Sequence, residues 1–150
     1  MKFFTSRNFA IRDKEGKVYG YGRSIWAMID TDSRQPVDIL QERGAQIEVA
    51  ENGKIAEEKF AASPAGYYDA VLMDVQMPVM DGRAAARSIR AMPRPDAQRV
   101  PIYALSADAF VEDERLSREA GMNGHLSKPV NFDELWKILQ QAVQESRQTN

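Results

Sequence analysis

The chain has 150 residues, of which 43% are hydrophobic and 28% are charged, and its net charge is -2. This length suits one domain of about 100–200 residues with its own core. The chain has no excess of basic residues, so its charge gives no reason to expect a nucleic-acid partner. Cysteine is absent, which excludes disulfides and thiolate metal sites and fits a reducing compartment. No stretch approaches the roughly 18 apolar residues of a membrane span, so we expect a cytoplasmic protein that binds neither membrane nor nucleic acid.

The N-terminal part of the chain has a β pattern. Phe9 and Ile11 lie on a strand-like stretch that reaches a turn at Asp13 to Gly16, and a β-prone segment from Val18 to Asp30 follows. Two strands joined so closely are expected to pair antiparallel, as a hairpin.

From about residue 45 onward, strand-like and helix-like segments alternate. The expected strands cover 46–50, 69–75, 100–107 and 124–127, and the expected helices cover 54–62, 82–91, 110–120 and a last one that opens at Asn131. The segment 69–75 holds the continuous apolar run 70–73, as in a strand buried on both faces, and 100–107 is the next buried strand. Repeated strand–helix units of this length predict an α/β fold with a parallel sheet and helices on both faces.

One group of basic residues follows helical spacing beside the Pro-rich segment 92–95. We interpret it as a solvated helix face, which is the usual role of such a stripe. Its members are Arg83, Arg87, Arg90 and Arg94.

Three polar residues follow three successive apolar strands. Asp74, Ser106 and Lys128 each stand at the carboxyl end of an expected strand, where sites form in open parallel sheets. A carboxylate can attack phosphorus and form an acyl phosphate. The transferred group carries charge on its three equatorial oxygens, which an ammonium, a hydroxyl donor and a divalent cation would stabilise. The three residues together therefore indicate phosphoryl transfer, although each alone could be an ordinary cap or surface residue.

Several separated motifs then resemble the receiver domains of response regulators, especially those fused to hybrid sensor kinases. The resemblance covers about residues 39–147. The matching segments are Leu72 to Gly82 around the acceptor, Ala104 to Ala107, Gly121 to Pro129 and the turn Glu51-Asn52-Gly53.

The resemblance implies a flavodoxin-like three-layer sandwich with a five-stranded parallel sheet. It also implies that Asp74 takes a phosphoryl group from a histidine kinase or a phosphotransfer domain, with Mg2+ held by Asp74 and the backbone carbonyl of Gln76. Ser106 and His125 would switch together and change the face formed by the helix from Phe110, the strand at Gly124 and the last helix. Pro78 and Gly82 would shape the acceptor loop, and the bond before Pro129 is commonly cis in this family. Such a domain signals and is not an enzyme, beyond transferring and losing its own phosphoryl group.

The N-terminus departs from the receiver pattern, in which two adjacent acidic residues follow the first strand. The nearest candidates are Asp30 and Asp32, after the apolar run Ile25 to Ile29. Residues 8–39 instead resemble a strand pair of acyl-ACP thioesterases, so one interpretation is a chimera, natural or engineered. Acyl-thioester hydrolysis is a remote alternative, because the catalytic Asn, His and Cys of that family find no match.

We expect Ile25 to Ile29 to fill the place of the first strand, between the second and third, because a gap there would expose two sheet edges. The expected organisation is a β extension over 1–24 and a receiver-like domain over 25–150, with an atypical first strand and helix at 25–44. A dimer that exchanges strands is the rival arrangement to a monomer. The alternative function is a phosphorylation-deficient interaction domain. The feature that distinguishes it from a phospho-accepting receiver is the Asp-Thr-Asp sequence at 30–32, which stands in place of two adjacent acids.

Overall fold

The computed structural model describes residues 9–12, 18–22, 25–28, 47–77, 79–107 and 110–148. Side chains are described over 47–77, 79–107, 110–142 and at 144. Asp30, Asp32 and Pro78, together with the expected shortened first helix, lie outside the described residues.

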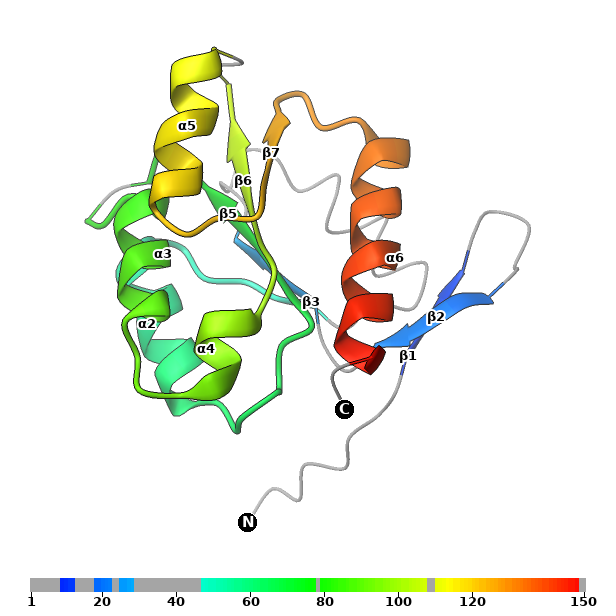
Figure 1. Ribbon diagram of the computed structural model, residues 1–150. Helices are drawn as coiled ribbons and strands as arrows, with labels where there is room; N and C mark the ends of the chain where they lie inside the picture. The colour runs from blue at the N-terminus through cyan, green and yellow to red at the C-terminus, as the bar shows by residue number, and fades with distance from the viewer. Residues whose placement is uncertain are drawn as a thin grey trace.

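A parallel sheet forms the centre of the molecule (Figure 1). Its order is β4-β3-β5-β6-β7. The strands are β3 (Ile25–Met28), β4 (Ile47–Glu48), β5 (Ala70–Asp74), β6 (Ile102–Ser106) and β7 (Gly124–Ser127). Strand β3 pairs in parallel with β4 on one side and with β5 on the other, opposite Ala70 to Met73. The prediction of an α/β fold with a parallel sheet is confirmed.

Alternate residues of the buried strands face two different cores, as the period of two in a strand requires. Helix α6 (Phe132–Gln148) packs on one face, where Leu72 and Leu105 share a core with its Leu135 and Leu139. Helices α2 (Gly53–Ala62), α3 (Gly82–Arg90) and α4 (Pro95–Arg99) share the other core with Val71 and Met73 of β5. All residues of β5 and β6 are buried, so these two strands form the interior of the sandwich.

The helix ends follow from local sequence. Asn52 caps α2, because its Oδ1 accepts the N–H of Ile55 at 2.9 Å, and Asp81 caps α3 by accepting the N–H of Ala84 at 2.8 Å. Gly121 has φ of +92° and follows α5 (Val111–Glu119), as expected of a left-handed residue after a helix. Asn131 accepts the N–H of Glu134 at 3.2 Å and so opens α6.

The structure adds detail to two segments of the chain. The segment 92–95 was expected only to end a helix, but α4 begins at Pro95, since proline also suits the first turn of a helix. The β-prone stretch from Val18 divides into β2 (Val18–Gly22) and β3. Strand β2 pairs antiparallel with β1 (Phe9–Arg12) in a separate two-stranded sheet and contacts α6.

Candidate phosphoryl-acceptor site

The carboxyl ends of three neighbouring strands meet at one edge of the sheet. Asp74 ends β5 and Ser106 ends β6, while Lys128 directly follows β7. Main-chain hydrogen bonds fix these ends: Val75 N–H donates to the carbonyl of Leu105 at 2.9 Å, and Lys128 N–H donates to that of Ser106 at 2.7 Å. The three residues predicted from sequence therefore lie on one rim.

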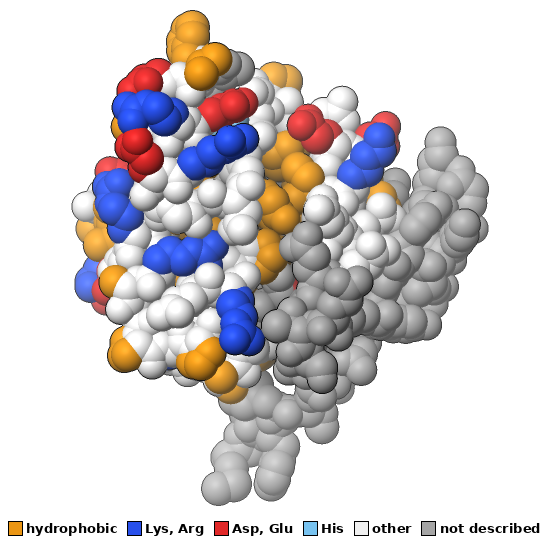
Figure 2. Space-filling view, in the orientation of Figure 1, with side chains coloured by type: hydrophobic (Ala, Val, Ile, Leu, Met, Phe, Trp, Pro, Cys, Tyr) orange, Lys and Arg blue, Asp and Glu red, His pale blue; other side chains and the backbone are white. Residues whose placement is uncertain are grey.

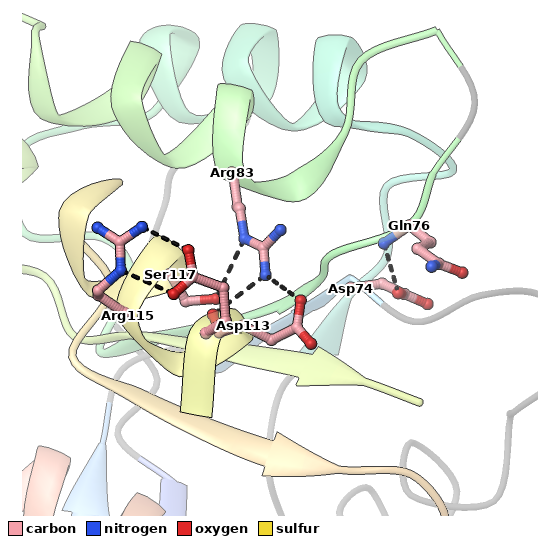
Figure 3. Close-up of polar contacts among 7 residues, drawn as sticks. Asp74, Gln76, Arg83, Asp113, Arg115 and Ser117 are labelled. Carbon is pink, nitrogen blue, oxygen red and sulfur yellow. Dashed lines mark hydrogen bonds and ion pairs between the residues drawn. The ribbon is translucent and has the colours of Figure 1, made fainter. Parts of the chain in front are cut away.

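Asp74 is the most deeply buried acid at this edge, with 1% of its surface exposed. Its Oδ2 accepts a hydrogen bond from Nζ of Lys128 at 2.5 Å. Its Oδ1 accepts the backbone N–H of Gln76 at 3.1 Å (Figure 3). A buried carboxylate needs such charged and hydrogen-bonded partners, because its desolvation is costly. The site thus places a buried carboxyl oxygen of Asp74 within hydrogen-bond distance of the Lys128 side chain.

Ser106 is 4% exposed and lies at the end of a fully buried strand. Together with Gln76 it lines an open cleft of about 710 Å³ between α3 and α5. His125 is half-buried on β7, opposite Ala104 of β6, and β6 lies between it and β5. The Lys128–Pro129 bond is cis, as the family resemblance implied.

The loop after β5 returns to the end of that strand at Gly82. Gly82 N–H donates to the carbonyl of Val75 at 3.0 Å, and Gly53 N–H donates to the carbonyl of Met80 at 3.1 Å. A Cβ placed on Gly82 would lie 2.0 Å from the carbonyl oxygen of Asp74. The expected role of Gly82 in shaping this loop therefore has a steric basis.

A divalent metal can be tested against the donors that are described. The carboxylate of Asp74 and the main chain of Gln76 offer the oxygen ligands that Mg2+ prefers. Over the residues whose side chains are described, no group of three or more His, Cys, Asp or Glu side chains could hold a metal ion. The donor chemistry at Asp74 and Gln76 fits Mg2+.

The prediction of a solvated arginine face is wrong for three of its four residues. Arg83 bonds to α5, Arg90 donates to Gly121, Ala97 and Asn123, and Arg94 pairs with Asp96 and lies over the ring of Phe60. Arg87 alone is exposed.

The partners of Arg83 were missed at the sequence level. Its Nη2 donates to Oδ1 of Asp113 at 3.2 Å and to the carbonyl of that residue at 3.1 Å, while its Nε donates to Oγ of Ser117 at 3.4 Å (Figure 3). Helical spacing places Arg83 on a helix face, but it carries no signal that a second helix thirty residues later lies opposite.

Comparison with known proteins supports this arrangement. The family model described as "Response regulator receiver domain" matches residues 33–140. The model described as "Acyl-ACP thioesterase N-terminal domain" matches residues 1–47, so both resemblances found in the sequence have a counterpart and overlap at 33–47.

Among solved structures, the receiver domain of the sensor histidine kinase PA1611 from Pseudomonas aeruginosa PAO1 is 36% identical, with a TM-score of 0.70. The match covers 81% of this chain and 98% of that one, which was solved with a magnesium ion coordinated in its active site cleft. The chemotaxis protein CheY4 of Vibrio cholerae is 29% identical with a TM-score of 0.68, over 79% of this chain and 98% of that one.

Curated relatives are mostly far longer than this chain. The sensor protein GacS of Pseudomonas syringae pv. syringae is 37% identical over 67% of this chain, which spans 11% of GacS. The two-component response regulator ORR41 of Oryza sativa subsp. japonica is 42% identical over 64% of this chain and 72% of its own length. The chain belongs to the response regulator receiver domain family, whose members serve in two-component phosphorelays.

Proposed function

We propose that Asp74 is the phospho-acceptor of this receiver domain and that its donor is a phosphohistidine on a histidine kinase or a phosphotransfer domain. The observation that carries the proposal is the carboxylate of Asp74, buried at the carboxyl edge of the sheet with Nζ of Lys128 at 2.5 Å. GacS and the PA1611 kinase, which contain similar receiver sequences, are named as sensor kinases, and this supports a kinase as the partner.

In the proposed reaction an oxygen of Asp74 forms a bond to phosphorus while the phosphorus–nitrogen bond of the donor breaks. The electron pair of that bond stays on the imidazole nitrogen of the donor. Lys128 compensates the charge of the carboxylate at rest and would then donate to an oxygen of the transferred group. Ser106 would turn toward the phosphoryl group and donate its hydroxyl to another of its oxygens.

Mg2+ would add positive charge beside the phosphoryl oxygens when it is bound. Asp74 and the carbonyl of Gln76 would hold it, with Asp30 and Asp32 as the further carboxylates. The receiver domain of PA1611, solved with magnesium in its cleft, supports this assignment, as does the position of both acids a few residues after β3.

The proposed organisation of the chain is a β extension over 1–24 and a receiver-like domain over 25–150, located in the cytoplasm. Strand β3 takes the place of the first receiver strand in a five-stranded sheet, and the hairpin of β1 and β2 precedes it. The parallel pairing of β3 with both β4 and β5 supports this arrangement. After phosphorylation, Ser106 and His125 would move together and change the face formed by α5, β7 and α6.

Intact mass spectrometry after incubation with phosphoramidate and Mg2+ tests the acceptor. We expect one phosphoryl group on the wild type and none on Asp74→Asn. Asp81→Asn is the matched control, since this nearby exposed acid caps α3 and asparagine can also serve as a cap. A phosphoryl group on Asp74→Asn would show that another residue is the acceptor.

The metal assignment has its own test. Chelation of Mg2+, or the change Asp30→Asn or Asp32→Asn, should slow phosphorylation of the wild-type acceptor. A folded wild type that never gains a phosphoryl group would instead support the phosphorylation-deficient interaction domain. Phosphorylation that is insensitive to both asparagine variants would remove these two acids from the site.

A further inference from the structure

Helix α5 is held loosely for an element beside the acceptor site. Of its nine residues only Ser117 is buried. Its N-cap, Phe110, makes no side-chain cap bond and is 68% exposed, and Val111 is 84% exposed. An element with so little buried apolar surface has a low local stability and can shift without disturbing the core.

Helix α3, by contrast, is fixed in the core. Its residues Ala85, Ala86 and Ile89 are fully buried against the sheet. Arg83 lies in the first turn of this helix, and Figure 3 shows its side chain directed toward Asp113 and Ser117 of α5. The ion pair with Asp113 is partly shielded from water, because the side chains are only 19% and 25% exposed. Helix α3, which is buried in the core, is therefore linked to the more exposed α5 through the guanidinium group of Arg83.

This contact lies beside the residue that is proposed to move. Arg83, Asp113 and Leu116 line the same cleft as Ser106 and Gln76. Ser106 precedes the first residue of α5 by only five positions in the sequence, so a shift of Ser106 toward Asp74 would pull on the start of α5. The bonds of Arg83 would resist that pull, since they tie α5 to a helix whose apolar residues are buried in the core.

We propose that Arg83 is a positioning residue that holds α5 in its resting place through Asp113 and Ser117, and that these bonds must break or rearrange when the domain is phosphorylated. The inference rests on the proposed function of Asp74 and deepens it. Contacts made only in the resting state oppose activation by their full free energy, and by linkage they weaken the binding of any ligand that favours the active state by the same factor. Removing them should therefore tighten that binding.

Beryllofluoride, which mimics the phosphoryl group on a carboxylate, is the probe. The wild type is titrated with it in the presence of Mg2+, and the backbone amide signals of Val111 to Glu119 are followed. We expect Arg83→Gln and Asp113→Asn to lower the half-saturating concentration about 5-fold or more, the low end of typical couplings between sites. Their unliganded α5 signals should also lie closer to those of the saturated wild type.

Two further variants separate positioning from general loss of structure. Arg99→Gln removes an exposed arginine at the end of α4, apart from the residues that line this cleft, and should leave the half-saturating concentration unchanged. Arg83→Lys keeps the charge but loses the planar fork, so its effect should fall between wild type and Arg83→Gln.

A folded Arg83→Gln protein with a wild-type half-saturating concentration would overturn the inference, even if hydrogen exchange showed a looser α5. A higher concentration would overturn it as well, because the bonds would then belong to the active state. A wild type that does not respond to beryllofluoride would overturn the proposed function itself, and α5 would then have no switch to oppose. The first two failures leave the acceptor role of Asp74 intact.

Discussion

Gly82 packs directly against the main chain of Asp74, since a Cβ on Gly82 would lie 2.0 Å from the Asp74 carbonyl oxygen and 2.9 Å from its carbonyl carbon. Helix propensity alone would make Gly82→Ala stabilising by about 1 kcal/mol, because α3 begins at this residue. The contact with fixed backbone should reverse the sign. We expect a loss of about 1–3 kcal/mol in the free energy of unfolding, measured with urea, together with slower phosphorylation of Asp74. A stabilised Gly82→Ala protein would contradict this packing.

Val79 has a left-handed backbone conformation, with φ of +68°. This conformation costs an L-residue with a Cβ about 1–2 kcal/mol, while asparagine tolerates it. The side chain of Val79 is 84% exposed, so its replacement loses little packing. Val79→Asn should therefore raise the free energy of unfolding by about 1 kcal/mol. Val79→Ala is the control and should gain less; equal effects of the two changes would argue against strain at this position.

Arg90 holds three segments together. It donates to the carbonyls of Gly121 and Ala97, both at 2.9 Å, and to Oδ1 of Asn123 at 2.8 Å. Burial lowers the pKa of its guanidinium from the ordinary value, a cost that these bonds offset. Arg90→Met should lower the free energy of unfolding by about 2–3 kcal/mol, because it leaves acceptors without a donor.

Arg87→Met provides the comparison for that change within the same helix. Arg87 is exposed, so this variant should stay within about 0.5 kcal/mol of wild type in the same urea titration. Similar losses for the two variants would show that the methionine, rather than the bonds of Arg90, causes the effect.

Asp96 links stability to pH. Burial raises the pKa of its carboxyl group, but the hydrogen bonds from Arg94 and from the N–H of Gly66 outweigh this, and the net pKa lies below the ordinary value of 3.8. A pKa that is lower in the folded state than in the unfolded state adds stability above pH 3.8, and this contribution is lost as the pH falls through the folded pKa.

The change Asp96→Asn should remove the part of the pH dependence of stability that comes from the Asp96 carboxyl group. At neutral pH it should cost about 1–2 kcal/mol, discounted for partial exposure of the ion pair. The difference between the two proteins should shrink as urea titrations are moved from pH 7 to below pH 4. A difference that stays constant over this range would show that Asp96 contributes by shape rather than by charge.

The parts of the fold that could be predicted are those in which local pattern and burial agree. The apolar runs before Asp74 and Ser106 indicate strands covered on both faces, and β5 and β6 are buried at every position. Since parallel strands bring their carboxyl ends to one edge, the approach of Lys128 to Asp74 follows from the order of the strands. Helix α6 was evident from its N-cap and its one-sided apolar stripe.

Other features depend on contacts between distant segments. The stripe of arginines has the spacing of one helix face, but the partners of Arg83 and two of the three partners of Arg90 come from residues thirty or more positions later. The Pro-rich segment 92–95 follows the end of α3, and α4 begins at Pro95. A proline is compatible with either the end or the first turn of a helix, so the sequence alone did not predict α4. Asp30 and Asp32 stay predictions, because they lie outside the described residues.

Strand β3 has a broader consequence. It lies within the stretch that matches the thioesterase model, yet it pairs with β4 and β5, which follow it in the chain. In this position the sheet requires a short extended segment with free main-chain groups and apolar bulk on both faces, and many unrelated sequences meet that requirement. The sequence of this interior strand can therefore differ widely without loss of the sheet. We expect that a receiver domain can be reassembled from two separate polypeptides, one that carries β3 and one that carries the elements from β4 onward.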